Sequence, residues 1–181
     1  CRSGDTKVWQ TLAETTIEIA TMKEEKKPVK FSGVSDKNGY FSNFASFPVT
    51  IDGKTWPTVE HYVQARQFKN GEFDEEFLRF RSASIVVRMS REREGSRRSD
   101  WDKVKDKVMR KAVKAKFTQH ENLRERLLAT GDQPIVQNTP NNDYWGDGGD
   151  GSGENRMGKI LMEIRSQMAK DFPDAVKRMR R

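Results

Sequence analysis

The stretch from Tyr144 to Asn155 combines residue types that can do chemistry: an aromatic pair, followed by glycines that alternate with carboxylates. Glycine lets the backbone approach a ligand closely, aromatic rings stack on planar groups, and carboxylates move protons or hold cations. A solvated linker does not need this mixture. We therefore predict that the stretch forms part of a ligand-binding site just ahead of an apolar helix.

Familiar glycine-rich motifs fit this stretch only in part. The glycine spacing from Gly146 to Gly151 agrees with a dinucleotide fingerprint, but that motif needs a preceding buried strand and a βαβ unit, which the sequence does not indicate. The run Gly153–Lys159 begins like a phosphate-binding P-loop, yet Ile160 stands where a hydroxyl should reach magnesium. A calcium loop is disfavoured because Trp145 occupies a ligand position. None of these three sites is predicted.

A second set of polar residues lies on a helix predicted from Thr58 to Lys69. The i,i+4 spacing places Glu60 and Gln64 on one face with His61 beside them, so the three could line a pocket. Simpler explanations exist, because Glu60 can complement the helix dipole and His61 can be a partly buried structural histidine. The same choice between a structural and a ligand-binding role applies to Asn43 and Trp101.

The elements that must position these side chains are mostly helices. Short strands are predicted at 29–31 and 47–51, and the second leads into a hairpin turn at Asp52-Gly53. Ser99 with Asp102 resembles a capping box at the start of the longest helix. A charged loop at 91–98 and a long loop before the last helix connect the helices. Apolar spacings of three and four predict those helices at Thr58–Lys69, Phe73–Phe80, Ile85–Met89, Trp101–Ala115, Leu123–Leu128 and Met157–Met168.

Composition sets the class of protein. A length of 181 residues suits one domain with a real core, and the net charge of +7 favours phosphate-bearing partners. Because Cys1 is the only cysteine and the chain has 2 histidines, we expect neither a disulfide framework nor a zinc site. No apolar run approaches the ~20 residues of a membrane span, so an intracellular, cytoplasmic protein without a membrane partner is expected. Residues 1–28 are predicted to be a polar tail, with a short helix at Trp9–Ile19 as the alternative.

Several separated motifs stand out in the chain. They are Gly39–Phe44, Asp52–Tyr62, Trp101–Met109 and Tyr144–Gly149, extended by Ala115–His120 and Leu127–Asp132. Taken together, they resemble one known family, NADAR, the YbiA-like N-glycosidases, and the resemblance spans roughly Val29 to Lys170. It implies a compact single-domain YbiA-like helical fold, mainly α with a small β component, in which residues 29–175 form the catalytic domain and 176–181 a basic C-terminal end.

The resemblance implies an N-glycosidase, an enzyme that cleaves the bond between a ribose carbon and a nitrogen, here without a metal or another cofactor. One activity attached to the family removes ADP-ribose from modified guanine in nucleic acid, and another releases ribose phosphate from early riboflavin-pathway intermediates. The first is the leading expectation, with ribosylaminopyrimidine phosphates and a non-catalytic ADP-ribose-binding module as the alternatives. It is favoured because a basic loop suits a pyrophosphate or a nucleic-acid backbone. That loop contains Arg91, Arg93, Arg97 and Arg98.

By the same resemblance, Glu60 and Asp147 are the carboxylates expected to stabilise an oxocarbenium-like sugar or to activate water. A variant mechanism uses an amine nucleophile and a Schiff base, for which Lys54 and Lys105 are candidates, unless both are solvated surface lysines. The expected ligand is ADP-ribose or a nucleotide-like small molecule, free or carried on DNA or RNA. The other expected site residues are Trp101 at the reacting bond and Asn43, Phe44, His61, Gln64, Lys105, Tyr144, Trp145, Gly148, Gly149 and Asn155 for binding.

Overall fold

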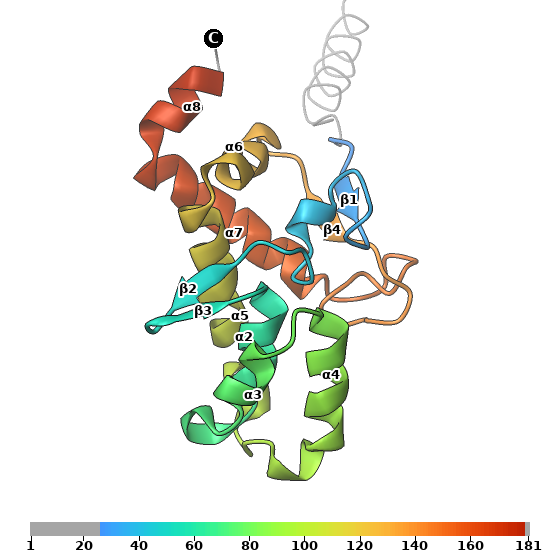
Figure 1. Ribbon diagram of the computed structural model, residues 1–181. Helices are drawn as coiled ribbons and strands as arrows, with labels where there is room; N and C mark the ends of the chain where they lie inside the picture. Colours follow the sequence, from blue (N-terminus) through green and yellow to red (C-terminus); the bar gives the residue numbers. More distant parts are fainter. Residues whose placement is uncertain (1–25, 180–181) are drawn as a thin grey trace, which may run out of the picture.

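A long central helix, α5 (Trp101–Gln119), organises the molecule (Figure 1). The computed structural model describes residues 26–179, so the predicted polar tail before residue 26 and the alternative helix at Trp9–Ile19 lie outside the described residues. The expected mainly helical fold with a small β component is confirmed. Helix α5 packs against α2 (Val59–Ala65), α6 (Glu121–Ala129), α7 (Arg156–Asp171) and strand β2 (Val49–Ile51).

The predicted hairpin is present. Strand β2 pairs antiparallel with β3 (Lys54–Trp56), with Val49 opposite Trp56. Both turn residues lie in the left-handed region, Asp52 with φ 53° and Gly53 with φ 77°, as a two-residue turn of this twist requires. The first strand begins at Val49 rather than at residue 47, because the intervening proline has no backbone N–H for the ladder.

A second sheet was missed by the sequence prediction, which placed β structure only early in the chain. Strand β1 (Val29–Phe31) pairs in parallel with β4 (Ile135–Gln137). A three-residue strand is too short to display an alternating pattern, so 135–137 was wrongly assigned to the long loop. This pairing brings the start of the described chain beside the glycine-rich loop (Figure 1).

The observed helix boundaries agree with the sequence in part. Helix α2 begins as predicted because the Thr58 side chain accepts a hydrogen bond from the His61 N–H, but it ends at Ala65, well before the predicted end. The predicted capping box is wrong, because α5 has Asp100 at its N-cap and the carboxylate of Asp100 is bound by Arg98 at 2.6 Å. The other elements are η1 (Gly39–Phe41), η2 (Lys69–Gly71), α3 (Asp74–Leu78), α4 (Ala83–Glu92), η3 (Glu94–Ser96) and α8 (Pro173–Met179). Helices α4 and η3 occupy most of the segment that was predicted to be a charged loop.

The side chain of Lys116 is buried together with the apolar core. Lys116 of α5 is only 1 % exposed, and its Nζ donates hydrogen bonds to the carbonyl oxygens of Tyr40 at 2.6 Å and Ser42 at 2.9 Å. The ring of Phe47 lies 5.3 Å from the same nitrogen. Burial lowers the pKa of Lys116 to about 7. Within residues 26–179, no helix has the length and the apolar character needed to cross a membrane.

This lowered pKa predicts an unusual dependence of stability on pH. Between the folded pKa of about 7 and the usual lysine value of about 10.4, the unfolded chain binds a proton that the folded chain does not, so stability rises with pH. The free energy of unfolding should therefore increase by about 2 kcal/mol more from pH 7 to pH 9 in the native protein than in Lys116→Met. Urea unfolding of both proteins at each pH measures the difference. Equal pH dependence in the two proteins would contradict a lowered pKa.

Candidate active site

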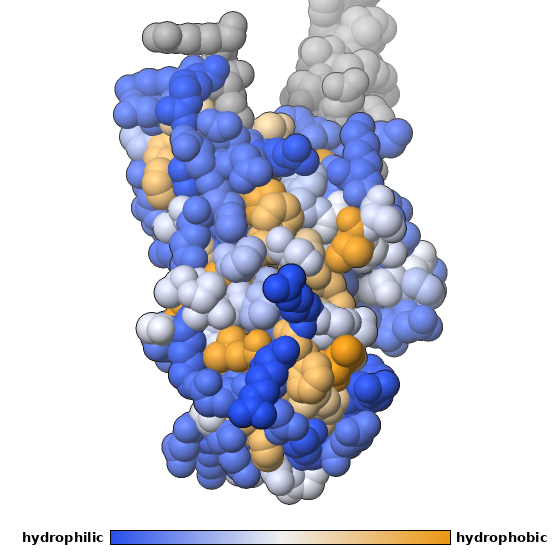
Figure 2. Space-filling view, viewed as in Figure 1, coloured by the Kyte–Doolittle hydropathy of each residue, from blue (hydrophilic) through white to orange (hydrophobic). Residues whose placement is uncertain are grey.

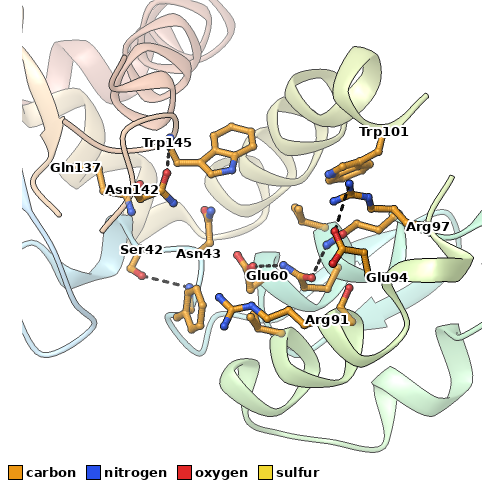
Figure 3. Close-up of a pocket in the computed structure, with 16 residues that line it drawn as sticks. Ser42, Asn43, Glu60, Arg91, Glu94, Arg97, Trp101, Gln137, Asn142 and Trp145 are labelled. Atoms are coloured by element: carbon orange, nitrogen blue, oxygen red, sulfur yellow. Dashed lines mark hydrogen bonds and ion pairs between the residues drawn. The ribbon is translucent and has the colours of Figure 1, made fainter. Parts of the chain in front are cut away.

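A cavity of about 610 Å³ opens where α2, the end of α4, the start of α5 and two loops meet (Figure 3). Its volume is that of a typical small-molecule site. In the same view as Figure 1, the molecular surface shows hydrophobic and strongly hydrophilic side chains next to each other near its middle (Figure 2). We call it the Glu60 cavity. It is lined by Ser42, Asn43, Phe44, Glu60, Val63, Gln64, Gln67, Val87, Ser90, Arg91, Glu94, Arg97, Trp101, Gln137, Asn142 and Trp145.

Glu60 is the buried carboxylate of this cavity. It lies in the first turn of α2 and is 7 % exposed, and its Oε1 accepts a 2.7 Å hydrogen bond from Gln64 Nε2. Burial raises the pKa of Glu60, and hydrogen bonds from the Gln64 and Asn43 amides lower it in part. A carboxyl group with a raised pKa exchanges protons closer to neutral pH than an exposed glutamate does, which suits acid–base catalysis.

Gln64 on α2 and Gln67, just after the end of this helix, connect Glu60 to the rest of the cavity. Gln67 Nε2 donates to Gln64 Oε1, and Gln64 in turn donates to Glu60 (Figure 3). The backbone carbonyl of Gln67 also accepts from the Arg98 N–H at 2.9 Å. Gln67 was not a predicted site residue, although its spacing of three from Gln64 and seven from Glu60 would have indicated it.

The segment after η1 forms the wall opposite Glu60. The carbonyl oxygen of Asn43 accepts from the Glu60 N–H at 3.1 Å, and Asn43 Nδ2 points to the sulfur of Met109 at 3.2 Å. Asn43 Oδ1 has no hydrogen-bond partner among the described residues. Phe44, next along the chain, is 39 % exposed at the cavity rim. This wall therefore presents one exposed ring to a ligand, whereas Asn43 Oδ1 is buried.

Two tryptophans from distant parts of the chain line the Glu60 cavity. Trp101 begins α5, and Trp145 belongs to the glycine-rich loop. The backbone N–H of Trp145 donates to Asn142 Oδ1 at 2.9 Å (Figure 3). The preceding Tyr144 packs edge-on against Trp145 with ring centroids 5.0 Å apart. Indole rings at a cavity wall can stack on a planar base.

The predicted basic loop divides into two parts. Arg91 and Arg97 line the Glu60 cavity, and Arg97 forms an ion pair with Glu94 at 3.6 Å. Arg93 is instead bound to Glu76, and Arg98 to a neighbouring aspartate, outside the cavity. The sequence prediction did not include three lining residues that repeat at helical spacing on or just after α4, namely Val87, Ser90 and Glu94.

Asp147 was expected to be a second carboxylate at the reacting bond, but it does not line the Glu60 cavity. It is 6 % exposed, and its carboxylate accepts hydrogen bonds from Asn138 Nδ2 at 3.0 Å, the Gly149 N–H at 2.9 Å and the Thr139 N–H at 3.2 Å. Burial acts to raise the pKa of Asp147, but these hydrogen bonds outweigh it and the pKa is lowered. Through these hydrogen bonds, Asp147 stabilises the conformation of the glycine-rich loop.

The glycine-rich loop owes its shape to residues that were expected to bind ligand. Gly148 and Gly149 have φ of 72° and 86°, values that suit glycine, and neither lines the cavity. Asn155 also has a positive φ, 48°, and its amide bridges the end of β4, accepting from the Gln137 N–H and donating to the Ile135 carbonyl. These three residues therefore fix the conformation of the glycine-rich loop and do not line the cavity.

His61 and Tyr144, which were also expected in the site, form hydrogen bonds outside the Glu60 cavity. His61 is fully buried between the Thr58 hydroxyl at 2.8 Å and the Phe80 carbonyl at 2.9 Å, and burial lowers its pKa. This arrangement agrees with the structural alternative. Tyr144 donates its hydroxyl to Asp106 at 2.6 Å and stays outside the cavity lining.

Neither candidate lysine nucleophile lies in the cavity lining. Lys54 pairs with Glu75 at 2.8 Å and Asp74 at 3.2 Å, and the hydrogen bond that it donates to Glu75 is the main cause of its raised pKa. A raised pKa keeps an amine protonated and therefore poorly nucleophilic. Lys105 pairs with Asp102 and lies 3.8 Å over the Tyr144 ring. In the part of the chain that the structure describes, no three His, Cys, Asp or Glu side chains gather as metal ligands would.

Comparison with known proteins agrees with this architecture. A family model described as the NADAR domain matches residues 30–169. The Escherichia coli protein named N-glycosidase YbiA is 50% identical over 141 residues, which cover 78% of this chain and 88% of that protein. A riboflavin biosynthesis protein of Vibrio vulnificus is 37% identical over 148 residues, 82% of this chain but only 40% of that protein.

The fold of a solved relative also agrees. The NMR structure of Escherichia coli YbiA superimposes with a TM-score of 0.75 at 48% sequence identity, covering 81% of this chain and 88% of that one. The family match spans most of the chain, including every element that forms the Glu60 cavity. The chain therefore belongs to the NADAR family of N-glycosidases.

Proposed function

We propose that the protein hydrolyses the bond between the anomeric carbon of a ribose and a base nitrogen, with Glu60 as the catalytic residue. The observation that carries this proposal is a buried carboxylate of raised pKa that accepts a hydrogen bond from Gln64, inside a cavity with tryptophan and arginine walls. Such a carboxylate can balance the positive charge that develops on the sugar as the bond to nitrogen breaks.

In the proposed reaction, a water molecule attacks the anomeric carbon while Glu60 takes its proton. The new carbon–oxygen bond forms as the carbon–nitrogen bond breaks, and the leaving nitrogen keeps the electron pair and takes up a proton. The other carboxylate of the lining, Glu94, is occupied by Arg97 and is largely exposed. Glu60 is therefore the group best placed to receive the proton from water and pass it to the leaving base.

ADP-ribose on guanine is the substrate class that we favour. Two arginines, Arg91 and Arg97, suit the two phosphates of a diphosphate, and Arg91 carries no ion pair within the described part of the chain. Two tryptophans offer one stacking surface each for the two bases of ADP-ribosyl guanine. A substrate with one phosphate and one base would use half of these groups.

A second candidate is a ribosylaminopyrimidine phosphate from riboflavin biosynthesis. The observation in its favour is the name of the Vibrio vulnificus relative, a riboflavin biosynthesis protein. The chemistry at Glu60 would be the same, because this substrate also carries a ribose–nitrogen bond.

Side-by-side turnover distinguishes these substrates. The protein is incubated with an oligonucleotide that carries ADP-ribosylated guanine and, separately, with a ribosylaminopyrimidine phosphate, and the products are identified by mass spectrometry. We expect free ADP-ribose and an unmodified oligonucleotide. Release of ribose phosphate from the pyrimidine alone would support the second candidate, and binding of ADP-ribose without any cleavage would refute the proposed hydrolysis.

The arginine wall gives a separate prediction. Arg91→Gln should raise KM for the ADP-ribosylated oligonucleotide by about 10- to 100-fold with little change in kcat, because a charge-assisted hydrogen bond contributes about 1.5–3 kcal/mol. Steady-state kinetics measure this, with Arg88→Gln as the control, since Arg88 lies on the same helix but outside the lining. An unchanged KM in Arg91→Gln would show that the phosphates bind elsewhere.

A further inference from the structure

The backbone segment that leads into Asn43 is bound by the buried side chain of Lys116. Lys116 Nζ donates to the carbonyl oxygens of Tyr40 at 2.6 Å and Ser42 at 2.9 Å, and Lys116 itself is not part of the cavity lining. The Ser42 carbonyl belongs to the peptide that joins directly to Asn43. A shift of this carbonyl therefore moves the Asn43 backbone.

We propose that Lys116 is a positioning residue, whose side-chain nitrogen holds the carbonyls of Tyr40 and Ser42 so that Asn43 stays in contact with Glu60. The kinetic consequence rests on the proposed function of Glu60, whereas the structural consequence does not. Lys116 is not part of the cavity lining, and its contact with the lining residue Ser42 is to the backbone carbonyl, so it acts through Asn43.

Asn43 is the link between the buried lysine and the carboxylate. Its backbone carbonyl accepts from the Glu60 N–H at 3.1 Å, and its side-chain amide lowers the pKa of the Glu60 carboxyl that burial raises. The same amide points to Met109 Sδ at 3.2 Å. Met109 and Lys116 are seven residues apart on one face of α5, so this helix contacts the Asn43 segment at two points.

A purely stabilising role does not account for a charge at this position. Burying an ammonium without a carboxylate partner is costly, and Lys116 forms no ion pair with any residue from 26 to 179. An apolar side chain of similar volume would avoid that cost but has no hydrogen to donate to the two carbonyl oxygens. The titratable and charged groups around it are Tyr40, Arg126 over the Tyr40 ring, and His120, whose ring packs on Phe47. His120 is itself bound to the Pro48 carbonyl.

The test compares Lys116→Met with Lys114→Met, a control at an exposed lysine on the same helix. Carboxyl carbon NMR follows the titration of Glu60 in each protein. We expect Lys116→Met to raise the pKa of Glu60, because the Asn43 amide that lowers it is displaced, and to lower kcat about tenfold with substrate affinity nearly unchanged. Lys114→Met should match the native protein in all three measurements.

A second variant, Lys116→Gln, keeps a hydrogen-bond donor without the charge and should shift the pKa of Glu60 in the same direction. An unchanged pKa of Glu60 in a folded variant would overturn the inference, and so would failure of both variants to fold, because Lys116 would then serve the core alone. The NMR result does not depend on which compound is cleaved. If the native protein cleaves neither substrate yet the pKa of Glu60 shifts, the proposed function fails and the positioning role stands.

Discussion

Glu60→Gln is expected to lower kcat about 1,000-fold while substrate affinity is retained, because the amide keeps the shape of the side chain but cannot accept a proton from water. The neighbours of Glu60 favour retention of the fold. Gln64 Nε2 can donate to the new amide oxygen as it donates to Glu60 Oε1 at 2.7 Å. Removing a buried carboxyl group also removes the cost of desolvating its charge.

Steady-state kinetics with the cleaved substrate, together with calorimetric binding of the intact substrate to the variant, measure both halves of this prediction. Glu92→Gln is the matched control, since Glu92 is an exposed glutamate of α4 outside the Glu60 cavity. A Glu60→Gln protein that is folded and turns over at the native rate would remove Glu60 from the mechanism.

Asp147→Ala should lower the free energy of unfolding by about 3 kcal/mol, because it leaves the Gly149 N–H, the Thr139 N–H and the Asn138 amide without their acceptor. Activity should fall with stability, since the same loop carries Trp145 into the cavity. Urea unfolding at neutral pH measures the loss. A change of less than about 0.5 kcal/mol would contradict the role of Asp147 in holding the loop.

Asp147→Asn separates a structural role from a catalytic one. The Asn oxygen can still accept from the two backbone N–H groups, so we expect this variant to keep most of the kcat that Glu60→Gln loses. The pKa of Asp147 is lowered by its hydrogen bonds, so its contribution to stability is present above the usual aspartate pKa of about 3.9 and is lost as pH falls through the folded value. The stability gap between the native protein and Asp147→Asn should therefore narrow on acidification. A folded Asp147→Asn protein with the same loss of kcat as Glu60→Gln would place Asp147 at the reacting bond.

Much of the fold could be predicted from the sequence, because its signals are local. The hairpin turn at Asp52-Gly53, the start of α2 after Thr58 and the apolar face of α5 each depend on a few neighbouring residues. The parallel pair of β1 and β4 could not, since strands of three residues carry no periodic signal and their pairing joins segments far apart in the chain. The end of α2 was also misplaced, because no glycine or proline marks Ala65.

The candidate site shows the same division between local and distant information. Glu60, Gln64 and Trp101 were identified from helix spacing and family motifs, and all three line the cavity. The sequence could not reveal that Asp147 turns toward backbone N–H groups of its own loop. Nor could it separate Arg97, which lines the cavity, from Arg98, which binds a neighbouring aspartate. Adjacent residues point in different directions, and only the three-dimensional arrangement decides which of them a ligand can reach.

The central claim is that the Glu60 cavity holds an N-ribosyl compound with its anomeric carbon beside Glu60. The most direct test is a crystal structure of Glu60→Gln with an uncleaved ADP-ribosylated guanine nucleotide. We predict that the anomeric carbon lies within about 3.5 Å of the side chain at position 60 and that the diphosphate faces Arg91 and Arg97. A ligand bound in the groove formed by Leu128, Arg165 and Val176, or with its ribose turned away from position 60, would contradict the account.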